Sequence, residues 1–174
     1  MGVDQMPSVL ILSDSHGLTR ELKDIKERHQ LQYMIHCGDS ELDYRAHEMD
    51  DLVKIAGNCD FDPHYPDEET IKINGITFFI THGHLYNVKT NLMKLAYRSV
   101  ELNAQVVCFG HTHIAMAEQY NELLFINPGS IRLPKIRPEK TYVIMEWEST
   151  EDIHVNFYTL DGEKIKSLSR KLSL

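Results

Sequence analysis

The chain has 174 residues, 42% of them hydrophobic, and a formal net charge of −8 at pH 7. This length supports one substantial core, so we expect a single domain over residues 6–174 behind a short lead, residues 1–5, of native or added origin. The acidic balance argues against a protein that grips nucleic acid along its backbone, because such proteins carry a basic face.

The first predicted element is an apolar strand that ends in a carboxylate and an imidazole. Val9–Leu12 is typical of a strand buried on both faces, and it leads into Ser13-Asp14-Ser15-His16-Gly17. In extended backbone, residues i and i+2 point the same way, so Asp14 and His16 are expected to converge. This pair alone would form half of a metal site.

Further strands end in residues of the same kind. They are predicted at Tyr33–Cys37, Leu52–Ala56, Ile76–Ile80 and Gln105–Phe109. They lead, in order, into Gly38-Asp39, Gly57-Asn58-Cys59-Asp60, Thr81-His82-Gly83-His84 and Gly110-His111-Thr112-His113. A single strand end of this kind is weak evidence, since many use polar residues for loop backbone, but the whole series predicts a metal site.

Helical spacing and turn residues place the segments between these strands. Helices are expected over Gly17–Gln30, over Glu41–Asp51 as a short polar helix, and over Asn87–Asn103 with Asn87 as its cap. The β-α-β-α-β order of the first half predicts parallel strands. Asn74-Gly75, between Thr70–Ile73 and Ile76–Ile80, predicts a β-hairpin because both residues tolerate positive φ.

The last third of the chain reads mainly as β-structure. Strands are expected at Ala115–Tyr120, Leu123–Ile126, Thr141–Trp147 and Ile153–Leu160, followed by a tail from Gly162. A parallel, helix-bearing first half and a meandering second half predict two sheets packed face to face with helices outside.

The candidate ligands are too many for one metal ion, since a catalytic zinc usually takes three protein ligands. They are Asp14, His16, Asp39, Asn58, His82, His111 and His113. If Asp39 bridges, each of two ions can have four protein ligands, and a hydroxide shared by the ions can attack phosphorus in line. Imidazole-rich sets suit manganese, our first expectation, as well as iron, zinc or nickel.

These motifs resemble the ordered motif set of the calcineurin-like metallophosphoesterases. Gly57-Asn58-Cys59-Asp60 and Asn127-Pro128-Gly129-Ser130 are most similar to its small bacterial and archaeal phosphodiesterase branch. The resemblance implies an α/β fold, a four-layer αββα sandwich of two mixed β-sheets flanked by helices. It also implies that one metal is held by Asp14, His16, Asp39 and His113, and the other by Asp39, Asn58, His82 and His111.

The candidate catalytic residues are Asp39, Asn58, Cys59 and His84. In phosphoprotein phosphatases of the superfamily, a histidine that can protonate the leaving group follows the asparagine, whereas this chain has Cys59. A thiol with a pKa of about 8.5 is a poorer acid at neutral pH, so we expect a steep dependence on leaving-group quality. His84 is the reserve candidate for proton transfer or phosphate contact.

Several polar residues have a structural interpretation. His36, inside an apolar strand, is expected to be a satisfied core histidine, and Cys37 and Cys108 are expected to be packing residues. The basic run Arg132, Lys135, Arg137 and Lys140 is either a solvated face or a loop at the mouth of the site, where an arginine could hold a phosphate.

The leading hypothesis is a phosphodiesterase that acts on a small soluble diester rather than on a nucleic-acid polymer. Phosphomonoesterase and nuclease activities stay open. From another class, a scaffold related to the retromer subunit, which keeps the fold without catalytic competence, is the alternative, although the ligand positions of this chain are complete.

The sequence also gives expectations for the location and the oligomeric state of the protein. Three cysteines without a secretory signal favour reduced thiols and a cytoplasmic protein. No window approaches the roughly 18 apolar residues of a membrane span, so no membrane partner is expected. A homo-oligomer stays open, because the apolar C-terminal strands could pair with a second copy.

Overall fold

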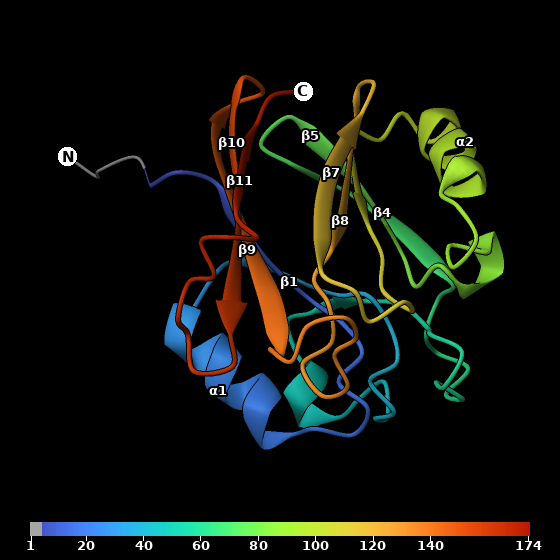
Figure 1. Ribbon diagram of the computed structural model, residues 1–174. Helices are drawn as coiled ribbons and strands as arrows, with labels where there is room; N and C mark the ends of the chain where they lie inside the picture. Colours follow the sequence, from blue (N-terminus) through green and yellow to red (C-terminus); the bar gives the residue numbers. More distant parts are fainter. Residues whose placement is uncertain (1–4) are drawn as a thin grey trace.

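Two β-sheets stacked face to face form the body of the computed structural model, which describes residues 5–174 (Figure 1). In spatial order, the larger sheet holds β11 (Arg170–Leu172), β10 (Asp152–Thr159), β9 (Thr141–Ser149), β1 (Ser8–Leu12), β2 (Tyr33–His36) and β3 (Val53–Lys54). The other sheet holds β4 (Glu68–Ile73), β5 (Ile76–Thr81), β6 (Val106–Cys108), β8 (Leu123–Asn127) and β7 (Met116–Tyr120). Residues 1–4 of the predicted lead lie outside the described residues.

One helix covers the outer face of each sheet, which confirms the four-layer prediction. Helix α1 (Arg20–His29) lies against the larger sheet, and helix α2 (Met93–Glu101) against the other (Figure 1). None of the helices within residues 5–174 combines the length and apolar character that a membrane span requires.

Alternating side chains along the strands fill three apolar layers. In β1, Ile11 belongs to the core between the sheets, while Leu12 packs with Leu22 of α1 on the outer side. In β5, Phe78 faces the inter-sheet core and Phe79 faces the layer beneath α2. Strand β1 is therefore buried on both faces, as its continuous apolar run predicts.

Parallel pairing gathers the predicted site loops at one end of the sheets. Strand β1 pairs in parallel with β2 and β2 with β3, while β5 pairs in parallel with β6 and β6 with β8. Backbone hydrogen bonds join the neighbouring loops, from Asp14 to Gly38 at 3.0 Å and from Gly110 to His82 at 3.0 Å. Because parallel strands end at the same edge, the loops after β1, β2, β3, β5 and β6 meet there.

The predicted hairpin is confirmed, with β4 and β5 antiparallel and φ angles of 45° at Asn74 and 87° at Gly75. Most other strands lie within one or two residues of their predicted ends. The tail from Gly162, for which no strand was predicted, contributes β11, which pairs with β10.

Two helix predictions need correction. The segment Glu41–Asp51 forms only a 3₁₀ turn at η1 (His47–Met49), because Glu41 has φ 56°, outside the right-handed helical region, and its N–H donates to Asp60 of another loop. Helix α2 begins at Met93 rather than near Asn87. Asn87 has φ 53° and ends η2 (His84–Tyr86), so it does not cap α2.

Candidate metal centre

The loops at this end carry non-glycine residues in the left-handed backbone region. Their φ angles are 54° at Asp14, 42° at His16, 56° at Asp39, 68° at His111 and 60° at His113. Such residues cost about 1–3 kcal/mol each and persist where surrounding contacts hold them. The convergence predicted for Asp14 and His16 is observed, but its stated reason was wrong, because neither residue is extended.

Asp14 lies at the centre of one cluster. Its Oδ1 atom is 3.1 Å from Nε2 of His113 and 3.7 Å from Nε2 of His16, and these two nitrogens are 3.3 Å apart. Its Oδ2 atom accepts hydrogen bonds from the Ser13 hydroxyl at 2.7 Å and the His111 N–H at 3.1 Å. One oxygen is thus held in place, and the other faces the imidazoles.

Asp39 connects His16 of this cluster with His82. Its Oδ2 atom is 3.2 Å from Nε2 of His82 and 3.9 Å from Nε2 of His16. Its Oδ1 atom accepts the N–H of Cys59 at 2.8 Å. His82 Nε2 also lies 3.8 Å from Oδ1 of Asp14. Asp39 therefore faces imidazoles from two loops, those of His82 and His16.

The Nδ1 atoms of three histidines are fixed by acceptors outside the cluster. His82 donates to the Cys37 carbonyl at 2.7 Å, and His113 donates to the Leu133 carbonyl at 2.7 Å. His16 faces Oε2 of Glu41 at 3.2 Å. A proton held at Nδ1 leaves the lone pair of Nε2 directed into the cluster, which is how metal-binding histidines are commonly oriented.

Among the buried atoms of the predicted ligands, Asp14 Oδ1 and His82 Nε2 have no hydrogen-bond partner within residues 5–174. His82 Nε2 and Asp39 Oδ2 are close enough for an ion pair at 3.2 Å, but their geometry is not that of a hydrogen bond. Buried polar atoms without a partner are costly, so native proteins usually satisfy them. Carboxylate oxygens and imidazole nitrogens are donors that suit divalent transition metals.

Three sets of ligand atoms each lie within 4.8 Å of one another. The sets are Asp14, His16 and His113; Asp14, Asp39 and His82; and His16, Asp39 and Cys59. Because the sets share members, they form one continuous cluster rather than separate sites. The donors present and the unpartnered atoms fit a metal centre.

In the cluster, each buried carboxylate lies beside histidines whose positive charge can balance it. Burial raises the pKa of the Asp14 and Asp39 carboxyls, but the neighbouring histidines outweigh it and hold both values below the usual range. Asp14 raises the pKa of His16 against burial. Burial lowers the pKa of His82, but Asp39 and Asp14 reverse this and raise it. Divalent ions would replace these protons as counter-charges of the carboxylates.

Two predicted ligands lie beside the three sets. The ring of His111 is 5.1 Å from that of His82 between centroids, and burial lowers its pKa to about 4, so it is a neutral imidazole at pH 7. Asn58 is exposed, and its Nδ2 donates to Cys59 Sγ at 3.4 Å. The ligand roles of both residues stay predictions.

The two predicted proton donors also border the cluster. Burial, followed by Asp39, raises the pKa of the Cys59 thiol to about 11, which makes it a weak acid at neutral pH. The His84 ring lies 5.4 Å from that of His82, and burial lowers its pKa. Nδ1 of His84 is buried without a hydrogen-bond partner in the described part of the chain.

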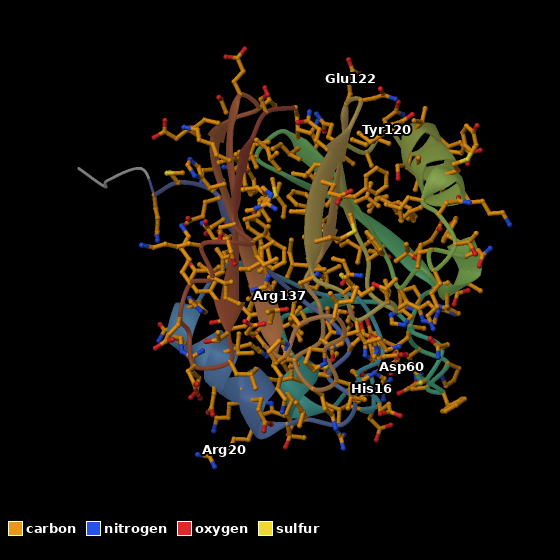
Figure 2. The ribbon with its side chains drawn as sticks, viewed as in Figure 1. His16, Arg20, Asp60, Tyr120, Glu122 and Arg137 are labelled. Atoms are coloured by element: carbon orange, nitrogen blue, oxygen red, sulfur yellow. The ribbon has the colours of Figure 1, made fainter. Side chains whose placement is uncertain are left out.

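The basic run divides between two places. The Arg132 guanidinium donates to the carbonyl of His16 and so lies beside the cluster. Arg137 pairs with Glu139 at 3.3 Å, and Figure 2 shows it apart from His16. Arg132 therefore fits the interpretation of a loop at the mouth of the site, and Arg137 does not.

The sequence assigned no role to the residues that support the ligands from behind, although three of them, Asp60, Asn127 and Ser130, belong to the quoted motifs. The Ser130 hydroxyl donates to the Asp14 carbonyl at 2.7 Å, and Asn127 Nδ2 donates to the Gly110 carbonyl at 3.0 Å. Glu41 and Asp60 support His16 and Asp39. The signal for Asp60 was its place in the Gly57–Asp60 turn, where a carboxylate accepts nearby N–H groups.

Comparison with known proteins gives consistent relatives. A family model described as the calcineurin-like phosphoesterase superfamily domain matches residues 8–150. The chain is 43% identical over 169 residues to the probable metallophosphoesterase YsnB of Bacillus subtilis, covering 96% of this chain and 99% of that protein. It is 25% identical over 182 residues to the phosphodiesterase YfcE of Escherichia coli K12, covering 87% and 94%.

Solved structures share the fold. A predicted phosphoesterase from Streptococcus pneumoniae TIGR4 superimposes with a TM-score of 0.93 at 30% identity, covering 98% of this chain and 99% of that one. Vps29 from Entamoeba histolytica, solved in complex with zinc, superimposes with a TM-score of 0.74 at 20% identity, covering 95% and 98%. At that identity the second likeness concerns the fold alone.

Proposed function

Because the chain belongs to the calcineurin-like phosphoesterase superfamily, we propose that it is a dinuclear metal-dependent phosphoesterase that cleaves small phosphodiesters. The observation that carries the proposal is the pair of buried ligand atoms, Asp14 Oδ1 and His82 Nε2, which lack a hydrogen-bond partner within residues 5–174. Nε2 of His82 lies 3.8 Å from Oδ1 of Asp14 and 3.2 Å from Oδ2 of Asp39, so metal ions held by these residues would leave neither atom unpaired.

The proposed ligands fall into two groups that share Asp39. The first metal would be held by Asp14, His16, Asp39 and His113, and the second by Asp39, Asn58, His82 and His111. Two divalent ions would supply a water molecule with a lowered pKa and would neutralise charge on the phosphoryl oxygens. Manganese is our first expectation, with iron, zinc or nickel as alternatives, because all of them accept imidazole ligands.

The chain orients these ligands before any ion binds. The Cys59 N–H holds Oδ1 of Asp39, so Oδ2 keeps its direction toward His82. Arg132 is exposed beside His16 and keeps guanidinium donors for a phosphate oxygen. This placement gives an acidic chain local positive charge where an anionic substrate would approach.

Neither candidate proton donor is a strong acid at neutral pH. The pKa of Cys59 is raised to about 11, and the pKa of His84 is lowered, chiefly by burial in both cases. We therefore expect activated aryl diesters to react much faster than alkyl diesters, because a poor leaving group depends on protonation. Equal rates across esters of widely different leaving-group pKa would contradict this expectation.

A scaffold is the second candidate. The observation that favours it is a groove of about 1390 Å³ between α2 and the β7–β8 hairpin, remote from the metal centre. Exposed apolar side chains border this groove, namely Met93, Tyr97, Val100 and Tyr120. Exposed apolar patches commonly mark protein contacts, and Vps29 shares the fold. The intact ligand set supports the enzyme as first choice.

The deciding experiment compares bis(p-nitrophenyl) phosphate with p-nitrophenyl phosphate after chelation and after each divalent metal is returned. We expect metal-restored cleavage, faster for the diester, and its loss in Asp39→Asn. Faster cleavage of the monoester would favour a phosphomonoesterase. No cleavage of either ester with two ions bound per chain would favour the scaffold.

A further inference from the structure

The carboxylate of Asp60 joins the loops that follow β2 and β3. Its Oδ2 atom accepts the N–H of Asp39 at 2.7 Å and the N–H of Gly57 at 2.7 Å. Its Oδ1 atom accepts the N–H of Glu41 at 2.8 Å and the hydroxyl of Ser40 at 3.3 Å. One side chain therefore satisfies donors from two segments, and both segments carry proposed metal ligands.

The loop after β2 needs such a partner because its backbone is strained. Asp39 and Glu41 both have φ 56°, a region that costs about 1–3 kcal/mol for each non-glycine residue. The N–H groups of these same two residues donate to Asp60. Charge-assisted hydrogen bonds of this kind are stronger than neutral ones and can hold the strained conformation.

The loop after β3 is pressed directly against Asp39. A Cβ atom added at Gly57 would lie 2.0 Å from Oδ1 and 2.5 Å from the backbone nitrogen of Asp39. The two loops therefore touch through backbone, and the position of Asn58, which follows Gly57, depends on the same contact. Asp60 is the group that bonds to both sides of it.

Asp60 also reaches His16 through Glu41. The Glu41 N–H donates to Asp60, while its Oε2 lies 3.2 Å from Nδ1 of His16. Figure 2 shows Asp60 and His16 at the same end of the molecule. The contact at Nδ1 sets the direction of the opposite ring nitrogen, which faces Asp14 and Asp39.

We propose that Asp60 is a positioning residue that sets the affinity of both metal positions by holding the backbone of Asp39, Gly57 and Glu41. This inference rests on the proposed function. Asp60 acts on the shared ligand by holding the backbone of Asp39. It acts on the second metal position through Gly57 and Asn58, and on the first through Glu41 and His16. Groups behind the ligands of a metal typically change its affinity by about 10–100-fold.

Asp62 provides a matched control two residues further on. Its carboxylate accepts the N–H of Tyr44 at 2.8 Å, the N–H of His64 at 3.0 Å and Nδ1–H of His64 at 2.7 Å. It therefore does the same kind of work for loop backbone, but its partners are not proposed metal ligands. Asp60→Asn and Asp62→Asn make the same chemical change at two sites.

The test titrates Mn²⁺ into the chelator-treated full chain and counts bound ions, with thermal unfolding in chelator as a second readout. Asp60→Asn should weaken Mn²⁺ binding by about 10–100-fold at both positions, whereas Asp62→Asn should leave it near wild type. A purely structural Asp60 would lower the Tm in chelator and leave binding unchanged. Wild-type affinity at both positions in Asp60→Asn would overturn the proposal.

Glu41→Ala keeps the test decisive if Asp60→Asn does not fold. The Glu41 side chain is 42% exposed, so its removal leaves no buried cavity. This variant should weaken one Mn²⁺ and spare the other, because Glu41 acts on His16 alone, and unchanged binding of both ions would count against the proposal. A wild type that binds two ions and cleaves neither ester would contradict the proposed function, while the effect of Asp60 on binding would still be measured.

Discussion

Two fully buried histidines, His82 and His36, lie at strand ends in this half of the molecule and have opposite surroundings. Nδ1 of His36 accepts the N–H of Gly38 at 3.1 Å, and its Nε2 contacts the Ser15 hydroxyl at 2.8 Å. His82 is bonded only through Nδ1, and its Nε2 has no hydrogen-bond partner in residues 5–174. Burial therefore does not distinguish these two histidines, whereas the surroundings of their Nε2 atoms do.

The same contrast appears in their charge. Burial lowers the pKa of His36 to about 4, so this ring is neutral in the folded protein. The pKa of His82 is raised because Asp39 and Asp14 outweigh its burial. The hydrogen bonds of His36 are thus complete within the protein. The carboxylates beside His82 need a cation to balance their charge, either a proton or a metal ion.

The largest expected effect comes from His82→Ala. Removing this proposed ligand should abolish binding at the proposed second metal position and lower kcat/KM by about 10³-fold or more, because bound ions supply several kcal/mol of transition-state stabilisation. Activity assays with returned Mn²⁺, together with ion counting, measure both changes. An active variant with two ions per chain would remove His82 from the proposed ligand set.

His36→Ala should have the opposite result. The change leaves Ser15 and the Gly38 N–H without their partner and opens a cavity, so the free energy of unfolding should fall by about 3 kcal/mol. Urea unfolding in chelator gives this value, and ion counting on the folded fraction should still find two metals. Unchanged stability with lost metal would show that the comparison between the two histidines is wrong.

These two histidines also show what the sequence could reveal. His36 lies inside the apolar run Tyr33–Cys37, and its prediction as a satisfied core residue is confirmed. His82 follows the last residue of β5, at the edge where parallel strands end, and that position predicted its place in the cluster. Strand pattern and chain order therefore predicted both the fold and where the candidate site lies.

Contacts between distant loops could not be predicted in this way. The segment Glu41–Asp51 has helix-compatible residues, but Glu41 has φ 56°, and its N–H donates to Asp60 of another loop. The extended backbone assumed for Asp14 and His16 was wrong for the same reason, since their φ angles are set by contacts with neighbouring loops. Local propensity does not record such tertiary partners.

A smaller effect is expected from Cys59→His, which adds a titratable ring beside the proposed metal ligands. An imidazole is a better acid than a thiol with a pKa of about 11, so alkyl diesters should gain about tenfold in rate while aryl diesters change little. Rates for a series of diesters measure the slope of the logarithm of the rate against the pKa of the leaving group. An unchanged slope would exclude proton donation from this position.

The smallest expected effect is the pH dependence of the chelator-treated protein. The raised pKa values of His16 and His82 mean that their ion pairs stabilise the fold fully below the unfolded value of about 6.5. That stability is lost as pH rises through the raised values, so the Tm should fall as pH rises above about 6.5. Partial exposure of His16 screens its share, which keeps the change small.

The contrast between His36 and His82 shows which part of the pH dependence of the Tm comes from the cluster. The lowered pKa of His36 makes the folded state bind fewer protons than the unfolded state from about pH 4 upward, so its contribution rises with pH, opposite to the fall expected from His16 and His82. His82→Ala should therefore reduce the fall in Tm above pH 6.5. Added Mn²⁺ should reverse it, because ions and protons compete for the same Nε2 atoms and binding strengthens as pH rises. A Tm that rises with pH in chelator would mean that the cluster is not held by protonated histidines.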